Sequence, residues 1–243
     1  MKKMVSVAIV LILATLVVSS PAMAFEASAD AYVGVYSKYL WRGFDLSDEN
    51  DNFVVQPGAD VSVGNFTVSF WGNISENTGE MNEVDLTLDY STDLSELVSV
   101  SVGNILYNVD TNDESPNTTN EVYLGLTLNT ILEPTLTVYY DYDEFESLYT
   151  TLGISHGLDI NDALSLSLGA TASYLSVDDV DNEFSDDSWL HNLELSAGLD
   201  YAVNENVSIS GVVLYSTPLS NDAEDNAGID DESTVGVSVS YAF

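Results

Sequence analysis

Apolar and polar residues alternate with a period of two along most of this chain. Residues 83–90 read Glu-Val-Asp-Leu-Thr-Leu-Asp-Tyr, and residues 234–243 read Thr-Val-Gly-Val-Ser-Val-Ser-Tyr-Ala-Phe. A period of two places apolar side chains on one face of an extended strand and polar side chains on the other. No stretch after residue 24 has a convincing helical period. The pattern therefore predicts an all-β protein.

Twelve segments carry this alternation, and each is at least ten residues long. Strands of soluble proteins usually have about five or six residues, whereas a tilted strand needs about 9–11 residues to cross a bilayer. An apolar outer face and a polar interior are typical of transmembrane barrels. We therefore expect an up-and-down antiparallel transmembrane β-barrel with strands near residues 30–45, 53–63, 66–76, 83–92, 98–109, 120–129, 134–143, 147–157, 164–177, 189–202, 207–217 and 233–243.

The connections between these segments alternate between two kinds. Short ones lie at 64–65, 92–97, 130–133, 158–163 and 203–206, and the others, several of them long and acidic, lie at 46–52, 77–82, 110–119, 144–146, 178–188 and 218–232. Outer-membrane barrels have short periplasmic turns, longer outer loops and an even number of strands. A secreted β-sandwich would explain the alternation but not the two kinds of connection. Both chain ends are therefore expected on the periplasmic side.

The two ends of the chain carry export signals. Residues 1–24 combine Lys2 and Lys3, an apolar run and the sequence Ala22-Met23-Ala24, which is the layout of a cleaved secretory signal peptide. Residues 25–243 then form a single outer-membrane β-barrel domain. The alternating last strand ends on Tyr241 and Phe243, which resembles the C-terminal assembly signature of outer-membrane barrels. The expected partners are outer-membrane lipid, lipopolysaccharide and the barrel assembly machinery.

Acidic residues dominate the charge, with 40 Asp and Glu against four Lys and Arg. Nucleic acid is excluded as a partner because phosphate binding needs a basic surface. The absence of Cys excludes disulfides and thiol chemistry. The polar phase of the strands predicts an acidic lumen wall formed by Asp60, Glu83, Asp85, Asp89, Glu121, Asp141, Glu194 and Asp200.

The two basic residues that remain after residue 24 lie four positions apart, Lys38 and Arg42. If residues 30–45 form one strand, both side chains point into the lumen, and Tyr39 and Trp41 point to the membrane interface. Arg42 would bind carboxylates in bidentate fashion and clamp the opposite wall. The other interpretation makes the pair an anion contact in an acid-lined passage.

The segment around these two residues resembles a known family. Residues 36–44, Tyr-Ser-Lys-Tyr-Leu-Trp-Arg-Gly-Phe, are similar to the N-terminal motif of the Gcw_chp family, and the similarity continues with Gln56, Gly58, Asp60 and Trp71-Gly72-Asn73. The resemblance implies an exported outer-membrane protein without an established activity. Two departures stand out, because Lys38 replaces a usual Asp and Asp45-Leu46 replaces a frequent Ser-Gln. If the family's Asp pairs with the Arg, this chain must recruit another carboxylate.

Catalysis and tight metal binding find little support in the sequence. The chain has two His residues, His156 and His191, predicted near opposite ends of the barrel, with His191 on the lipid side in phase with Leu193 and Leu195. No nucleophile and base come together, so we expect no enzyme and no cofactor. The oxygen-rich loop residues Asp178, Asp179, Asp181 and Glu183 are weak candidates for loosely bound Ca²⁺ or Mg²⁺.

Two functional hypotheses remain open from the sequence. Twelve strands lie between the filled eight-stranded barrels and the open porins, and an acidic wall favours cations. A narrow passive, porin-like channel for cations or small neutral solutes is the first hypothesis. A non-conducting structural or adhesion barrel that displays acidic loops is the second. Inward tyrosines that could fill the lumen favour this second hypothesis, namely Tyr32, Tyr36, Tyr107, Tyr123, Tyr139 and Tyr149.

Overall fold

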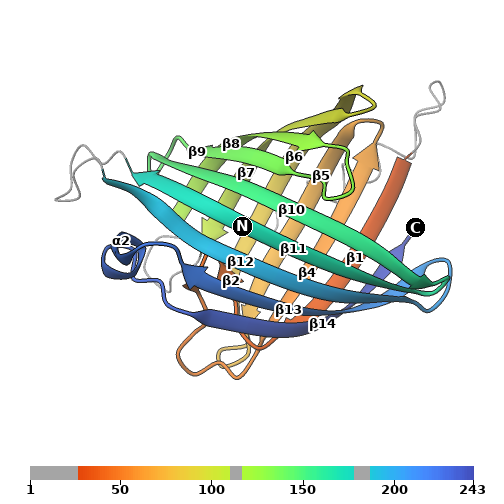
Figure 1. The fold of residues 1–243 in the computed structure, drawn as a ribbon. Helices are drawn as coiled ribbons and strands as arrows, with labels where there is room; N and C mark the ends of the chain where they lie inside the picture. The colour runs from red at the N-terminus through yellow and green to blue at the C-terminus, as the bar shows by residue number, and fades with distance from the viewer. Residues whose placement is uncertain (1–26, 110–116, 178–186) are drawn as a thin grey trace, which may run out of the picture.

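The chain forms a closed antiparallel barrel in a computed structural model that describes residues 27–109, 117–177 and 187–243 (Figure 1). Twelve strands make the wall, and each pairs with its neighbours in sequence. These strands are β1 (Ala27–Tyr36), β4 (Val54–Val63), β5 (Phe66–Ser75), β6 (Met81–Ser95), β7 (Val98–Val109), β8 (Asn117–Leu128), β9 (Thr135–Asp141), β10 (Ser147–Asn161), β11 (Leu164–Val177), β12 (Asp187–Ala202), β13 (Val207–Pro218) and β14 (Glu232–Ala242). The predicted transmembrane barrel of about twelve strands is confirmed.

Pairing of the first and last strands closes the barrel. In β1 and β14, Val33 lies opposite Val239, and the backbone N–H of Phe243 donates to the carbonyl of Ala29 at 2.9 Å. Both ends of the described wall therefore lie at one end of the barrel, together with the short turns. We call this the turn end, and the opposite end, with connections 37–53, 76–80, 142–146 and 219–231, the loop end. A lipid-facing sheet needs such closure because an open edge would leave backbone groups unpaired.

The outward face of the wall is apolar. Large apolar side chains from every wall strand except β4 stand exposed on it, among them Val33, Leu88, Leu124, Leu152, Leu195 and Val237. A water-soluble monomer rarely exposes such a continuous apolar surface, whereas lipid would cover it. The polar residues of the same strands point inward, so the alternation in the sequence correctly predicted which face each residue occupies over most of the wall.

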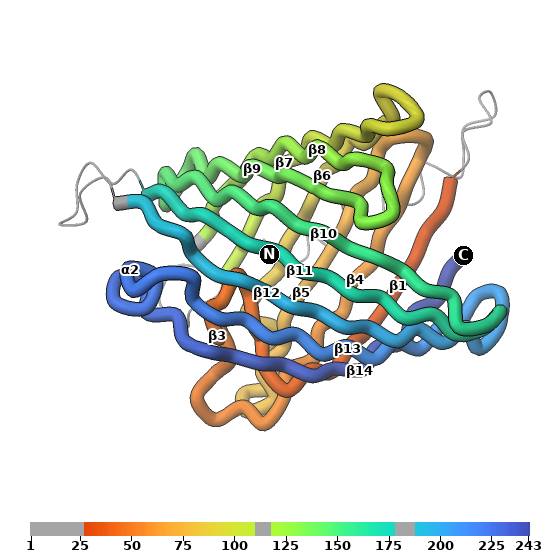
Figure 2. Tube along the Cα trace, viewed as in Figure 1, coloured from red at the N-terminus to blue at the C-terminus, as the bar shows by residue number. Residues whose placement is uncertain are grey.

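The predicted strand at residues 30–45 is wrong in its second half. β1 ends at Tyr36, and the chain then leaves the wall after the N–H of Ser37 donates to the carbonyl of Val235 at 2.9 Å. Residues 40–45 form a separate hairpin of β2 (Leu40–Trp41) and β3 (Phe44–Asp45), which Figure 2 traces in orange at the loop end. We call residues 38–45 the inner hairpin. Tyr39 and Trp41 belong to it, so they do not lie at a membrane interface.

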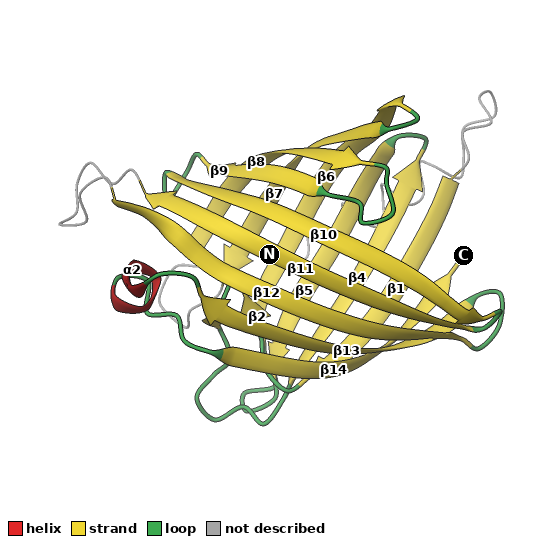
Figure 3. Cartoon of the chain, in the orientation of Figure 1, coloured by secondary structure: helices red, strands yellow, loops and turns green. Residues whose placement is uncertain are grey.

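The described part of the chain contains one short helix, α2 (Asn221–Asp225), drawn red in Figure 3. It lies in the connection between β13 and β14, and the Ser220 hydroxyl caps its first turn by accepting from the N–H of Ala223 at 3.2 Å. No described helix is long and apolar enough to span a membrane.

Candidate functional site

The inner hairpin reaches from the β1 side of the lumen to the opposite wall. Its two-residue turn is formed by Arg42 and Gly43, whose φ angles are 51° and 88°. Positive φ at both central positions is the signature of a type I′ turn, which suits the twist of a tight hairpin. Arginine is uncommon in this conformation, so contacts made by its side chain must hold it there.

Arg42 is held by an ion pair and by aromatic rings. Its guanidinium donates two hydrogen bonds of 2.8 Å to the two carboxylate oxygens of Glu121 on β8. The rings of Trp41, Tyr139 and Tyr149 lie 4.4, 4.8 and 4.2 Å from its Cζ atom. The two charged side chains are only 14% and 4% exposed. Arg42 therefore joins the hairpin to the far wall in the bidentate geometry expected from its chemistry, but from inside the lumen rather than from a wall strand.

His191 lies inside the barrel, so its predicted position on the lipid side is wrong. A β-bulge in β12 sets His191 and Asn192 together opposite Ser173, between the pairs Ala172–Leu193 and Tyr174–Leu190. An extra residue reverses the inward and outward phase of everything beyond it. The sequence around the bulge carries no Gly or Pro that would have announced it.

The buried His191 ring connects the wall to the hairpin turn. Its Nε2 lies 2.9 Å from the carbonyl oxygen of Arg42, and its Nδ1 accepts from the indole N–H of Trp189 at 3.1 Å. These contacts assign the proton to Nε2, because Nδ1 already acts as the acceptor. The neighbouring Asn192 extends these contacts along the wall. Its side chain accepts a hydrogen bond from the Tyr149 hydroxyl at 3.2 Å and donates one to Ser216 at 2.9 Å. No pattern in the sequence indicates these contacts.

The residues of the predicted acidic wall have different surroundings. Glu121 binds Arg42 and also accepts from the hydroxyl of Tyr107 at 2.8 Å. Asp141 is 2% exposed and accepts from Thr119 at 2.6 Å and from two backbone N–H groups of residues 143 and 145, so it orders the connection after β9. These two carboxylates have structural partners at the loop end.

The other predicted carboxylates are spread along the lumen. Asp89 accepts from Tyr123, and Asp200 accepts from Ser210, each at 2.5 Å. Glu194 accepts from Asn192 at 3.2 Å, Glu83 is buried, and Asp60 lies opposite Asp30. None of these five side chains has a basic partner among the described residues. The lumen therefore keeps a strong negative charge.

A second cluster, apolar in nature, covers the loop end. Trp189, Ala223 and Ile229 form its buried core, and Phe44 of the inner hairpin packs against it. Phe44 also contacts the ring of His191 with ring centroids 5.4 Å apart. The α2 connection thus packs down on the hairpin tip. Inward tyrosines add to the filling, since Tyr107 and Tyr149 are only 8% and 4% exposed.

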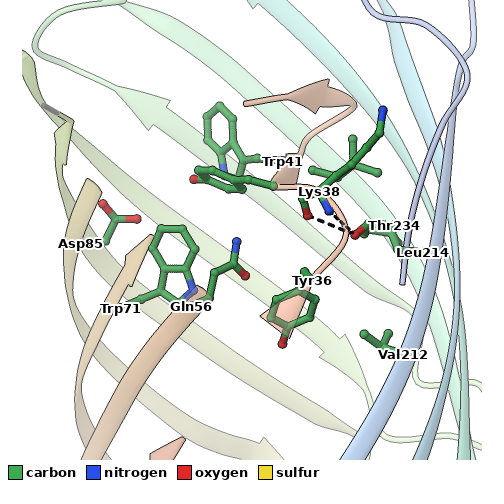
Figure 4. A pocket seen from close by; sticks show the side chains of 11 residues that line it. Tyr36, Lys38, Trp41, Gln56, Trp71, Asp85, Val212, Leu214 and Thr234 are labelled. Carbon is green, nitrogen blue, oxygen red and sulfur yellow. Dashed lines mark hydrogen bonds between the residues drawn. The ribbon is translucent and has the colours of Figure 1, made fainter. Parts of the chain in front are cut away.

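A cavity of about 360 Å³ lies on the other side of the hairpin (Figure 4). Trp41 and Trp71 lie on one side of it with Asp85, and Lys38, Thr234, Val212 and Leu214 lie on the other. Sequence reasoning missed its apolar lining. The available signal was the pair Val212 and Leu214, which interrupts the inward serines of β13 at positions 208, 210 and 216.

The predicted loop candidates for a divalent cation, Asp178, Asp179, Asp181 and Glu183, lie outside the described residues. Within the described ranges, no group of three or more His, Asp or Glu side chains is placed to hold a metal ion.

The sequence matches the family described as a bacterial protein of unknown function (Gcw_chp) over residues 19–235. The chain belongs to the Gcw_chp family. A search of curated proteins found no match. The resemblance carried by residues 36–44 and by Trp71-Gly72-Asn73 is therefore confirmed, and these residues correspond to the inner hairpin and to the wall that it faces.

Solved structures show where this Gcw_chp fold has parallels. The NanC porin matches with a TM-score of 0.54 and 15% identity, over 88% of this chain and 98% of the porin. The COG4313 outer membrane channel from Pseudomonas putida F1 matches with a TM-score of 0.50 and 9% identity, over 93% and 98%. At such low identity these similarities establish the fold, which is that of outer-membrane channels.

The two departures from the Gcw_chp motif contact each other. The Lys38 ammonium lies 2.8 Å from Asp45 on β3 and 2.6 Å from Glu232 on β14. Hydrogen bonds to Asp45 and Glu232 raise the pKa of Lys38. Partial burial acts to raise the pKa of Asp45, but hydrogen bonds from Lys38 and Ser47 outweigh it and lower that pKa. The charge of Lys38 is therefore balanced by the carboxylates of Asp45 and Glu232.

Proposed function

We propose that this chain is a narrow passive channel of the bacterial outer membrane that favours cations or small neutral solutes. Residues 1–24 act as the cleaved signal peptide, and residues 25–243 form the barrel. The wall has the apolar outer face that lipid requires, and the fold is shared with proteins that are named as channels.

The balance of charges in the lumen supports the cation preference most directly. Both basic residues of the described chain are neutralised by carboxylates, Arg42 by Glu121 and Lys38 by Asp45 and Glu232. Asp60, Asp89, Asp200 and their neighbours have no such partner. An acidic lumen with low-dielectric walls concentrates cations and repels anions.

The inner hairpin supports the narrowness of the proposed passage. It occupies the lumen at the loop end, where Arg42 fixes it to β8 and His191 fixes it to β12. Solutes would have to pass beside the hairpin, along the side that contains the cavity. Size selection would then follow from one anchored segment rather than from the width of the barrel.

The test is single-channel recording in planar bilayers of the full chain, expressed for export and purified from membranes. Discrete conductance steps and a cation-selective reversal potential across a salt gradient are expected. The double variant Asp89→Asn and Asp200→Asn should reduce the selectivity, while Glu80→Gln in an exposed connection should leave it unchanged. Anion selectivity would contradict the proposed cation preference.

The second candidate is a non-conducting barrel that displays acidic loops. The packing of Phe44 under Trp189 and Ile229 favours it, because these side chains close part of the loop end. A folded, heat-resistant barrel without conductance steps in the same recordings would support this function and overturn the channel.

A further inference from the structure

The cavity beside the inner hairpin has the composition of a ligand site. Its walls include the rings of Tyr39, Trp41 and Trp71, and its size of about 360 Å³ lies in the range of small-molecule sites. The Tyr39 and Trp71 rings contact each other with centroids 5.2 Å apart. Tryptophan is the best aromatic partner for a cation.

Asp85 lies between two aromatic pairs. On the wall it is directly opposite Trp71 of β5 and Tyr107 of β7. Above these two residues the hairpin places Tyr39 on Trp71 and Trp41 on Tyr107, the latter pair with centroids 5.9 Å apart. The carboxyl group of Asp85 therefore lines the cavity together with three of these rings, those of Tyr39, Trp41 and Trp71.

The Oδ1 atom of Asp85 is buried and has no hydrogen-bond partner among the described residues. Such an atom is costly, because burial removes its water without providing a donor. A bound cation would supply the missing partner.

Three other polar side chains around the cavity already have partners. The Lys38 ammonium contacts Asp45 and Glu232, and the Thr234 hydroxyl contacts the backbone of Lys38 at 3.1 and 3.2 Å. The side-chain amide of Gln56 donates to Asn73 at 3.2 Å. These three side chains are therefore less able to bind the many hydroxyls of a sugar, which argues against a polyol as the ligand.

Three aliphatic side chains complete the cavity in an otherwise polar lumen. Leu40 comes from the hairpin, and Val212 and Leu214 come from β13 (Figure 4). They would favour a ligand with an apolar body, since water gains nothing from contact with them.

We propose that this cavity binds a small organic cation, an amine or quaternary ammonium compound with a compact apolar body, on its way through the barrel. Asp85 is its counter-ion, the indoles of Trp41 and Trp71 contact the charged group, and the aliphatic side chains contact the body. The inference deepens the proposed function and rests on it for the role in passage, but binding itself requires no conduction.

The experiment measures binding to the full chain purified in detergent, by calorimetry and tryptophan fluorescence. The probe is choline, compared with its uncharged carbon isostere, in which a tert-butyl group replaces the trimethylammonium group. Choline should bind saturably. The affinity of the isostere should be lower by about tenfold or more, because the isostere lacks the charge. Equal binding of both compounds, or no saturable binding of choline, would overturn the proposal.

Variants locate the site. Asp85→Asn should weaken choline binding about tenfold, whereas Glu80→Gln, in an exposed connection, should not change it. If Asp85→Asn fails to fold, Trp71→Leu should show the same loss by calorimetry, and unchanged affinity in the folded variant would contradict the site. Conductance without choline binding would contradict the binding site but not the channel. Choline binding without conductance would contradict the channel but not the binding site.

Discussion

Arg42 and Glu121, 79 positions apart in the chain, meet in two hydrogen bonds of 2.8 Å inside the barrel. This contact decides where the inner hairpin lies, because the left-handed conformation of Arg42 has to be stabilised by its side chain.

Removal of the charge of Glu121 should destabilise the protein strongly. In Glu121→Gln the buried guanidinium loses its counter-ion, and breaking a buried pair in this way costs about 3–5 kcal/mol. Urea unfolding of the protein in detergent, followed by tryptophan fluorescence, measures the change in the free energy of unfolding. Glu80→Gln, in an exposed connection, is the control and should stay within about 0.5 kcal/mol. Equal effects of both substitutions would show that the pair does not anchor the hairpin.

Two glycines with similar backbone angles should respond differently to alanine. Gly43 and Gly79 have φ angles of 88° and 67°, so Ala is strained at both, by roughly 1–2 kcal/mol. A Cβ atom at Gly43 would also lie 3.2 Å from Ile229 and 3.3 Å from Asn192, whereas nothing lies within 4 Å at Gly79. Gly43→Ala should therefore lower the unfolding free energy more than Gly79→Ala. The opposite order would contradict the packing of the hairpin tip.

The inward position of His191 predicts whether substitution by leucine raises or lowers the free energy of unfolding. His191→Leu leaves the carbonyl of Arg42 and the indole N–H of Trp189 without partners, at a cost of about 1–3 kcal/mol for each group. If the side chain faced lipid instead, leucine would be the better residue and the barrel would become more stable. Urea unfolding of the variant distinguishes the two positions by sign.

The Lys38–Asp45 pair should make the docking of the inner hairpin depend on pH. Asp45 has a lowered pKa, so its contribution is present above its unfolded pKa of about 3.9 and is lost as the pH falls through the lower folded value. Lys38 has a raised pKa, so its contribution is present below about 10.4 and is lost as the pH rises through the higher folded value.

The substitution Lys38→Met tests this dependence because it removes the contribution of Lys38 and the part of the Asp45 contribution that comes from Lys38, while the hydrogen bonds from Ser47 remain. The urea midpoint of the variant should change less with pH at both extremes than that of the unsubstituted chain. Parallel pH profiles for the two proteins would be the contrary result.

The terminal aromatic residue should matter for assembly rather than for stability. Phe243 is 77% exposed, and its backbone N–H, which a substitution keeps, makes its contact with Ala29. Phe243→Ala should leave urea unfolding within about 0.5 kcal/mol but lower the amount of protein recovered from outer membranes. An unchanged yield in membrane fractions would remove the assembly role predicted for Tyr241 and Phe243.

The sequence alone determined the barrel. A period of two fixes the face of a residue as long as its strand continues, so the bounds of β7 and β11 agree with the predicted segments 98–109 and 164–177. The same local rule predicted the inward tyrosines and the alternation of short and long connections. A sheet with lipid on one face and polar groups on the other can adopt few arrangements other than a closed barrel.

The tertiary structure decided the site. The alternation continues through residues 37–45, yet the chain leaves the wall there, because Arg42 contacts Glu121 and the rings of Tyr139 and Tyr149, which only the closed barrel brings together. One bulged residue in β12 likewise reverses the phase of His191. Local periodicity contains no information about partners 79 or 149 positions away, and those distant contacts are what place the hairpin and the cavity beside it.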